Sequence, residues 1–288
     1  MSRTLERGRL SRAATCLSRL KAAPTILTVM LAVLSASAAA QWLRYPTAGV
    51  PRTRDGRPDL AARAPRAADG RPDLSGVWAN DGYDPNGVEG LGPMPKTVFF
   101  DLSFGLKDTR PPYQPWAAEL YASRREQNSK DNPDARCLPI GPLQMLAHPL
   151  PKKILQHPGL LVILHERNME FRQIFTDGRR LPADPQPSWY GYSSGRWDGD
   201  TLVVETVGFR DGLWADFNGS PLTDQAKMTE RFRRPNFGRL EIQVTVDDPR
   251  AYTKPWTVNV HQHIALDTDL LEYACLENEK DVPRLVGK

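Results

Sequence analysis

The chain has 288 residues, with 38 Lys or Arg, 34 Asp or Glu and three Cys. Six of these basic residues and one acidic residue lie within the first 40 positions, so the rest has 32 basic and 33 acidic residues and a net charge of about −1. Binding to nucleic-acid phosphates needs a basic stripe. Such a balance excludes nucleic acid as the expected partner.

The first 40 residues have the pattern of an export signal. Basic residues precede an apolar run from Thr25 to Leu34, which leads into an Ala-x-Ala cleavage site at Ser35–Ala40. The run is shorter than the ~20 residues that span a bilayer as a helix. We therefore predict a cleaved signal peptide over 1–40, a mature chain that starts at Gln41 without a transmembrane span, and a periplasmic or secreted location. An uncleaved anchor is the alternative.

Residues 41–74 are rich in Pro, Arg and Ala and show no helical or strand periodicity, which predicts an extended arm or linker. The hexapeptide Asp-Gly-Arg-Pro-Asp-Leu occurs twice in it, at Asp55–Leu60 and Asp69–Leu74. Six residues are too few for a structural repeat unit. Residues 75–288 are predicted to form one β-barrel-like domain.

The first part of this domain shows few regular elements. Residues 80–115 are predicted to be a long irregular segment, interrupted by a possible strand at Thr97–Phe100. One helix is predicted near 116–128, because Trp116 and Leu120 fall on one face after a proline-rich stretch.

The second part alternates as strands do, and its turns are well marked. Paired strands are expected on either side of Asp198-Gly199 and of Asn236-Phe237-Gly238. The full set is Leu160–Asn168 with Glu170–Phe175, Tyr190–Trp197 with Asp200–Val207, Met228–Arg234 with Arg239–Val246, and Trp256–Leu266 with Leu270–Cys275, together with Val77–Asn80. We predict a mainly β fold, an antiparallel meander that closes into a barrel. An open sheet or a sandwich is the alternative.

Removal of the leader also removes Cys16, so two cysteines remain. In an oxidising compartment Cys137 and Cys275 are expected to form a disulfide. Two buried free thiols are the alternative.

Several stretches resemble a family of uncharacterised exported bacterial proteins, and the resemblance covers nearly all of the mature chain. They are Asp69–Trp78, Asp134–Pro139, Gly195–Thr206, Thr229–Phe232 and Asp247–Trp256. This resemblance implies no activity. Gly76-Val77-Trp78 also resembles the start of lipocalin-like barrels, which implies a Trp that closes one end of the barrel.

Glu230 is the first candidate for chemistry. The three-residue turn pairs it with Val244, on the apolar side of the strand Leu240–Val246, so it should point inward. A buried carboxylate is either paired or has a raised pKa, and both conditions recur at functional sites. It is a candidate acid or base with Arg231 or Arg234 as anion holder. A structural pair with Arg234 or Arg172 is the other reading.

The hairpin around Asp198 offers candidate ligand-binding residues. Tyr192, Arg196 and Glu205 share one of its faces, which suits a cavity that orients a polar ligand. The opposite face, with Ser193 and Gly195, is an equally good candidate for the interior.

The long connection Gly208–Lys227 carries Trp214 and Asp216, and Trp189 precedes the hairpin. Long loops at a barrel mouth often bear specificity groups. Asp216 is a candidate base, and Trp189, Trp214 and Arg234 are candidate ligand contacts. The alternative is a Trp that fills the core and an Asp that caps a turn.

We predict neither a metal nor a cofactor. His261 and His263 share a strand face, but the opposite side, with Val258 and Val260, is the core side by composition. Nucleophile elbow, phosphate loop and dinucleotide fingerprint are absent from the sequence.

Two functions remain open. The first is an exported lipocalin-like protein that binds a small amphipathic ligand. The second is a periplasmic hydrolase, lyase or isomerase with an interior Glu/Arg site on the same barrel. An envelope interaction protein without a pocket is a third reading, and the oligomeric state is not predicted.

Overall fold

The computed structural model describes residues 45–80, 98–106 and 110–275. The chain divides into two units, Met1–Tyr45 and Pro46–Lys288, and only the second is described beyond one residue. The predicted signal peptide, the start at Gln41 and Thr97 of the possible early strand lie outside the described residues.

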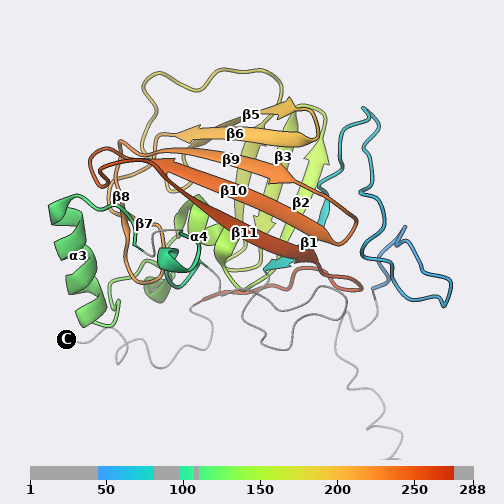
Figure 1. Cartoon of the computed structure of the whole chain (residues 1–288), viewed down its shortest axis with the longest axis horizontal. Coiled ribbons are helices and arrows are strands. Elements are labelled where there is room, and N and C mark those ends of the chain that lie inside the picture. The colour runs from blue at the N-terminus through green and yellow to red at the C-terminus, as the bar shows by residue number, and fades with distance from the viewer. Residues whose placement is uncertain (1–44, 81–97, 107–109, 276–288) are drawn as a thin grey trace, which may run out of the picture. The chain divides into compact units, whose positions relative to one another are not determined.

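In the described part of Pro46–Lys288, nine strands close into a barrel in the order β1-β11-β10-β9-β6-β5-β4-β3-β2 (Figure 1). The predicted mainly β fold and its closure are confirmed. The strands are β1 (Gly76–Asn80), β2 (Lys152–His157), β3 (Leu160–His165), β4 (Glu170–Phe175), β5 (Tyr192–Asp198), β6 (Thr201–Val207), β9 (Lys227–Arg233), β10 (Arg239–Asp247) and β11 (Trp256–Ile264). A small separate sheet contains β7 (Leu213–Trp214) and β8 (Pro221–Leu222).

The hairpin of β9 and β10 has the predicted register. Val244 lies opposite Glu230 and Ile242 opposite Phe232. The alternate residues Leu240, Ile242, Val244 and Val246 are all buried, as the period of two requires. Gly199 supplies the positive φ of 57° for the tight turn between β5 and β6.

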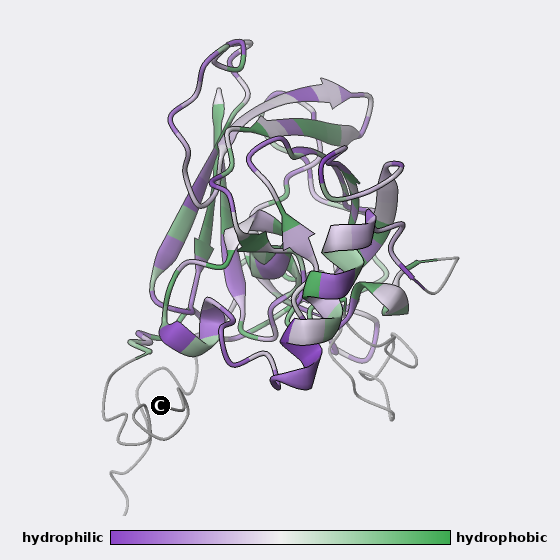
Figure 2. Ribbon diagram, turned by 90° about the vertical axis from the view of Figure 1, so that its left-hand side faces the viewer, coloured by the Kyte–Doolittle hydropathy of each residue, from purple (hydrophilic) through white to green (hydrophobic). Residues whose placement is uncertain are grey.

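Two helices accompany the barrel. Helix α3 (Pro115–Glu126) begins at a proline, where the missing N–H costs nothing, and matches the predicted helix near 116–128. Only Ala117 of α3 is buried, and Figure 2 shows this helix mostly in hydrophilic colours. Helix α4 (Gly141–Ala147) was not predicted, and all seven of its residues are buried. Two single turns, η2 (Leu102–Phe104) and η3 (Asp134–Arg136), complete the helical elements of the described residues.

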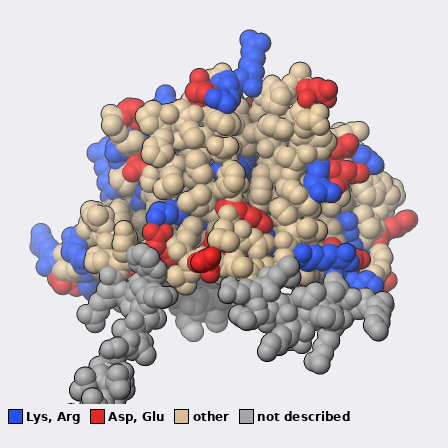
Figure 3. Space-filling view, turned by 180° about the vertical axis from the view of Figure 1, so that it is seen from behind, with Lys and Arg blue, Asp and Glu red and all other residues tan. Residues whose placement is uncertain are grey.

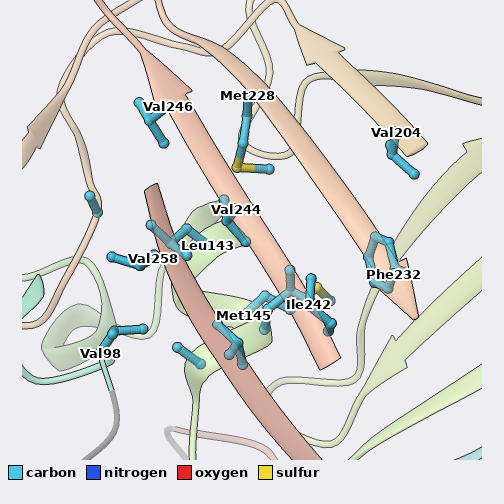
Figure 4. Packing of buried hydrophobic residues seen from close by; sticks show 14 of the residues in the cluster. Val98, Leu143, Met145, Val204, Met228, Phe232, Ile242, Val244, Val246 and Val258 are labelled. Carbon is cyan, nitrogen blue, oxygen red and sulfur yellow. The ribbon is translucent and has the colours of Figure 1, made fainter. Parts of the chain in front are cut away.

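Helix α4 fills part of the barrel core. Figure 4 shows Leu143 and Met145 of α4 among Ile242, Val244 and Val258 of β10 and β11, and all five belong to one cluster of buried apolar residues. A helix that is buried all round needs apolar side chains on every face, and an amphipathic period is then absent. No such period therefore marks α4 in the sequence.

Three sequence predictions were wrong. Val98–Phe100 is a turn whose Val98 and Phe99 are buried, and Leu270–Cys275 forms only an isolated bridge from Tyr273 to Arg167. The sheet is also not a pure antiparallel meander, because β4 and β5 pair in parallel. Two consecutive strands that run parallel need a crossover connection, which brings the chain back to the end at which the first strand began. Residues 176–191 form this connection.

Trp78, in β1, is held by the segment that precedes it and by Arg234. Its side chain is fully buried, and its indole N–H donates to the Leu74 carbonyl at 3.0 Å. The Arg234 guanidinium lies 4.8 Å from the Trp78 ring and donates to the Asp73 carbonyl at 2.7 Å and to the Phe237 carbonyl at 2.7 Å. Arg234 thus joins the first strand to the β9–β10 turn.

The two hexapeptides fold alike. Two residues before the first, the Thr53 N–H donates to the Arg57 carbonyl, and two residues before the second, the Ala67 N–H donates to the Arg71 carbonyl, both at 2.9 Å. The same six residues therefore specify the same turn twice, a local repeat despite their short length. The segment also contacts the barrel, because Phe237 and Gly238 donate backbone N–H groups to Ala62 and Leu60 at 2.8 Å.

Charged side chains are interspersed by sign on the face shown in Figure 3, where blue and red atoms alternate across a largely uncharged surface. Exposed ion pairs of the described chain include Arg66 with Asp200 at 2.7 Å and Arg231 with Asp198 at 3.0 Å. Pairs of this kind contribute little to stability.

Candidate functional site

The weakest join in the barrel wall lies between β4 and β5. These strands pair at only two positions, Ile174 with Ser193 and Phe175 with Ser194. Residues 170–173 of β4 therefore have β3 as their only strand partner in the described chain. The crossover 176–191 then passes beside this gap.

A groove of about 810 Å³ opens at this join, and we call it the seam groove. Pockets of this size suit small organic molecules. Its aromatic lining consists of Phe171, Phe175, Trp189, Tyr190 and Tyr192, its charged lining consists of Glu170, Arg172, Arg179 and Arg180, and Pro139, Asn168, Met169, Gln173, Leu181, Pro182, Ser188, Gly191, Ser193 and Ser194 complete it.

Three large side chains at the rim of the seam groove are exposed. Phe171 is 61% exposed, Met169 57% and Tyr192 38%. Neighbouring exposed apolar side chains of this size mark interaction or ligand sites. Asn168 and Met169 also both have positive φ, 53° and 52°, a conformation that costs energy for residues other than glycine and that clusters at functional sites.

The rim loop is fixed by the disulfide. Cys137 and Cys275 are bonded, with α-carbons 5.6 Å apart. The Asn168 side chain lies between their backbones, donating to the Cys137 carbonyl at 3.2 Å and accepting from the Cys275 N–H at 3.1 Å. The disulfide therefore holds a loop that lines the seam groove.

A fully buried ion pair lies behind the groove. Arg172 Nη1 donates to Glu230 Oε1 at 2.7 Å and Arg172 Nη2 donates to Glu230 Oε2 at 2.5 Å, and the two side chains are 1% and 0% exposed. Ser193 and Thr206 hydroxyls accept from Nη2 at 3.0 and 2.9 Å. The inward direction of Glu230 is confirmed, and Arg172 rather than Arg234 is its partner. The Arg172 Nε atom has no partner among the described residues.

Glu170 lies at the groove wall beside this pair. It accepts hydrogen bonds from Arg167 Nη1 at 2.8 Å and from the Tyr190 hydroxyl. Burial raises the pKa of Glu170. Arg167 also donates to Asp134, whose pKa stays below its ordinary value: burial raises it, but hydrogen bonds from His148 and the Arg167 charge outweigh that effect.

Three further titratable side chains, His148, His165 and Lys152, are buried near Asp134 and Arg167. The His148 and His165 rings are 5.1 Å apart, and burial lowers the pKa of both. Lys152 Nζ donates to the Leu146 and His148 carbonyls at 3.1 and 2.9 Å. These carbonyls lie at the C-terminal end of α4, where helix carbonyls lack intrahelical donors and favour a cation. Lys152 therefore fastens α4 inside the barrel.

Burial lowers the pKa of Lys152 to about 7, from 10.5 in an unfolded chain. Between these values the unfolded state binds more protons, so this group makes the free energy of unfolding rise with pH. Urea unfolding at pH 7 and pH 9 should show this rise in the wild type, with a slope of up to roughly 1.4 kcal/mol per pH unit. Lys152→Met should reduce it, whereas Lys227→Met at an exposed position should not. Equal slopes in all three proteins would contradict the assignment.

The sequence left open which face of the β5–β6 hairpin points into the barrel, and the structure shows it. Ser193, Gly195, Leu202 and Val204 are buried, so this is the interior face. Arg196 and Glu205 lie on the outer face and form an exposed ion pair at 2.9 Å, so their expected place in an interior cavity was wrong. Tyr192 is on the outer face too, but it lines the seam groove.

The other predicted ligand-binding residues lie in different parts of the structure. Trp189 lines the seam groove, with the Arg210 guanidinium 4.0 Å from its ring. Trp214 is 3% exposed and lies away from the groove, under Arg124 at 4.3 Å. Arg234 lies at the Trp78 end. The structure therefore brings Trp189 and Tyr192 together, with Glu230 behind them, and leaves Trp214 and Arg234 elsewhere.

The contacts of Asp216 are those of a residue that holds a loop in place. Its carboxylate accepts from the Leu102 and Ser220 backbone N–H groups and from the Ser220 hydroxyl, each at 2.9 Å. Burial raises its pKa to about 6 although these bonds oppose the shift. A carboxylate enclosed by four donors, with Gly219 N as the fourth, fixes the loop in the way an Asp cap does.

His261 and His263 are half-buried and alternate with the buried Val258, Val260, Gln262 and Ile264, which confirms their expected face. Over the described residues, no group of three or more His, Cys, Asp or Glu side chains is placed to hold a metal ion. None of the described helices combines the length and apolar character needed to cross a membrane.

Sequence reasoning missed most of the groove. Phe171 and Phe175 alternate with Arg172 and Ile174 in β4, so two Phe side chains share the outer face of one strand. That signal was present in the sequence. The need for Gly191 is visible only in the structure: its φ is +64°, and a Cβ there would lie 2.6 Å from the Val207 carbonyl oxygen.

Comparison of the chain with protein-family models, with curated proteins and with solved structures finds no match.

Proposed function

We propose that this is an exported binding protein that holds a small amphipathic molecule in the seam groove. The aromatic lining of this groove, open to solvent beside a buried ion pair, is the observation that carries the proposal. Aromatic side chains supply apolar contact area, and a few polar groups orient a ligand. The closed barrel is compatible with a lipocalin-like binding protein.

Export is supported by two features. The first 40 residues have the composition of a cleaved signal peptide, and the folded chain carries a disulfide, which forms and persists in oxidising compartments. The resemblance to a family of exported bacterial proteins agrees with a periplasmic or secreted location.

The enzymatic alternative finds less support. A general acid or base must reach the substrate proton, within hydrogen-bonding distance. Both Glu230 oxygens are bonded to Arg172, the side chain is 0% exposed, and Glu230 does not line the seam groove. We assign Glu230 the role of a counter-ion that positions Arg172 at the groove wall.

Phe171→Ser tests the site. Because Phe171 is exposed, its loss should change stability by no more than about 0.5 kcal/mol. Binding of the fluorescent apolar probe phenylnaphthylamine should weaken by roughly tenfold, because one of the five aromatic contacts of the groove is removed. Fluorescence titration measures this directly.

Phe100→Ser is the matched control. Phe100 is 47% exposed and is not part of the seam groove, so the same chemical change there should leave probe binding unchanged. Equal binding by the wild type and both variants, or no binding at all, would refute the proposed site.

A further inference from the structure

The charges around the seam groove are not balanced. Four charged side chains line it, and three of these are neutralised at close range by a partner. Glu170 is bound to Arg167 at 2.8 Å, Arg172 to Glu230 at 2.5 Å and Arg179 to Asp177 at 2.6 Å. Each of these pairs contributes no net charge to a ligand in the groove.

Arg180 is the exception. It lines the seam groove and is exposed, and it has no ion-pair partner among the described residues. Its neighbour Arg179 is committed twice over, to Asp177 and to the Phe175 ring, whose centre is 3.6 Å from the guanidinium carbon. Arg180 is therefore the cation of this groove that remains available to a ligand.

Behind the groove, Arg172 has one nitrogen without a partner. The Nε atom of Arg172 is buried and makes no hydrogen bond with the described residues, although both terminal nitrogens of the same guanidinium are bonded. Buried donors without partners are uncommon, because each costs free energy. This donor is enclosed, so what the groove offers a ligand is the one uncompensated positive charge of Arg180 at its rim.

We infer that the natural ligand carries a single negative charge on an aromatic or otherwise flat apolar body, as an aryl carboxylate or sulfonate does. The five aromatic side chains contact the body, and Arg180 binds the anionic group. A guanidinium matches the two oxygens of such a group geometrically. This inference rests on the proposed ligand-binding function of the seam groove and specifies its ligand class.

The test uses two probes that differ in one group. Anilinonaphthalene sulfonate has the same aromatic body as phenylnaphthylamine and one additional anionic group. The folded wild-type protein should bind the sulfonate about fivefold more tightly at low salt, as expected for an ion pair at an exposed rim. Added salt should reduce this preference.

Arg180→Gln should bring the two dissociation constants together, and Arg180→Lys should keep most of the preference. Arg54→Gln is the matched control, because Arg54 is exposed, lies outside the groove, and its loss changes the net charge by the same amount. Its preference should equal that of the wild type.

The outcomes separate the two proposals. If both probes bind equally well and Phe171→Ser weakens both, the groove binds ligands but the inferred charge selectivity is wrong. If Arg54→Gln reduces the preference as much as Arg180→Gln does, the effect is one of net charge and the inference fails. If neither probe binds, the proposed function fails first.

Discussion

Glu230→Gln is expected to lower the free energy of unfolding by about 3 to 5 kcal/mol, because it leaves the Arg172 guanidinium charged and unpaired in the protein interior. The change keeps the shape of the side chain, so packing is preserved. The melting temperature should fall by roughly 10 °C or more. Thermal unfolding and phenylnaphthylamine binding should be measured on the same samples.

Two variants control this experiment. Glu205→Gln removes a carboxylate of the same type from the exposed pair with Arg196 and should have a much smaller effect. The double variant Arg172→Met with Glu230→Met removes both charges and should recover much of the lost stability. A Glu230→Gln protein that keeps its melting temperature but loses probe binding would overturn the structural role and favour a functional one.

Replacement of both Cys137 and Cys275 by Ser should also have a large effect. The disulfide joins residues 138 positions apart, and in the chain-entropy model such a loop contributes about 5 kcal/mol, although measured values are often lower. Probe binding should weaken too, because Asn168 would lose its fixed position between the two cysteine backbones.

Reductant provides the control for this pair. It should lower the melting temperature of the wild type to that of the double variant and leave the double variant unchanged. Free alkylation of both thiols in the folded, unreduced protein would show that the bond is not formed.

The sequence predicted best where a period and a turn agreed. The β9–β10 hairpin has a strict period of two and a turn of fixed length, so register and the direction of Glu230 followed. The partner of Glu230 could not be chosen, because Arg172 reaches it across the barrel from a strand 58 residues away in sequence. Such a contact depends on tertiary closure.

The sequence indicated single members of the seam groove, such as Trp189 and Tyr192, but the groove itself could not be predicted, for a related reason. Its walls come from β4, from the crossover and from the start of β5, and the parallel pairing of these strands is fixed by how the chain returns rather than by local preference. The short apolar helix α4 was hidden because a fully buried helix has no amphipathic period.

The two-position pairing of β4 with β5 also has a kinetic consequence. Closing the barrel there requires the crossover to be ordered first, which costs loop-closure entropy. The few backbone hydrogen bonds between β4 and β5 offset little of this cost. The seam should thus be the last part of the wall to form and the first to open, a local fluctuation well below global unfolding. Amide protons of β4 and β5 at the seam would then exchange with solvent faster than those of β9 and β10. A bound molecule that contacts both walls would slow that exchange. Such a ligand would therefore stabilise the closed barrel reversibly.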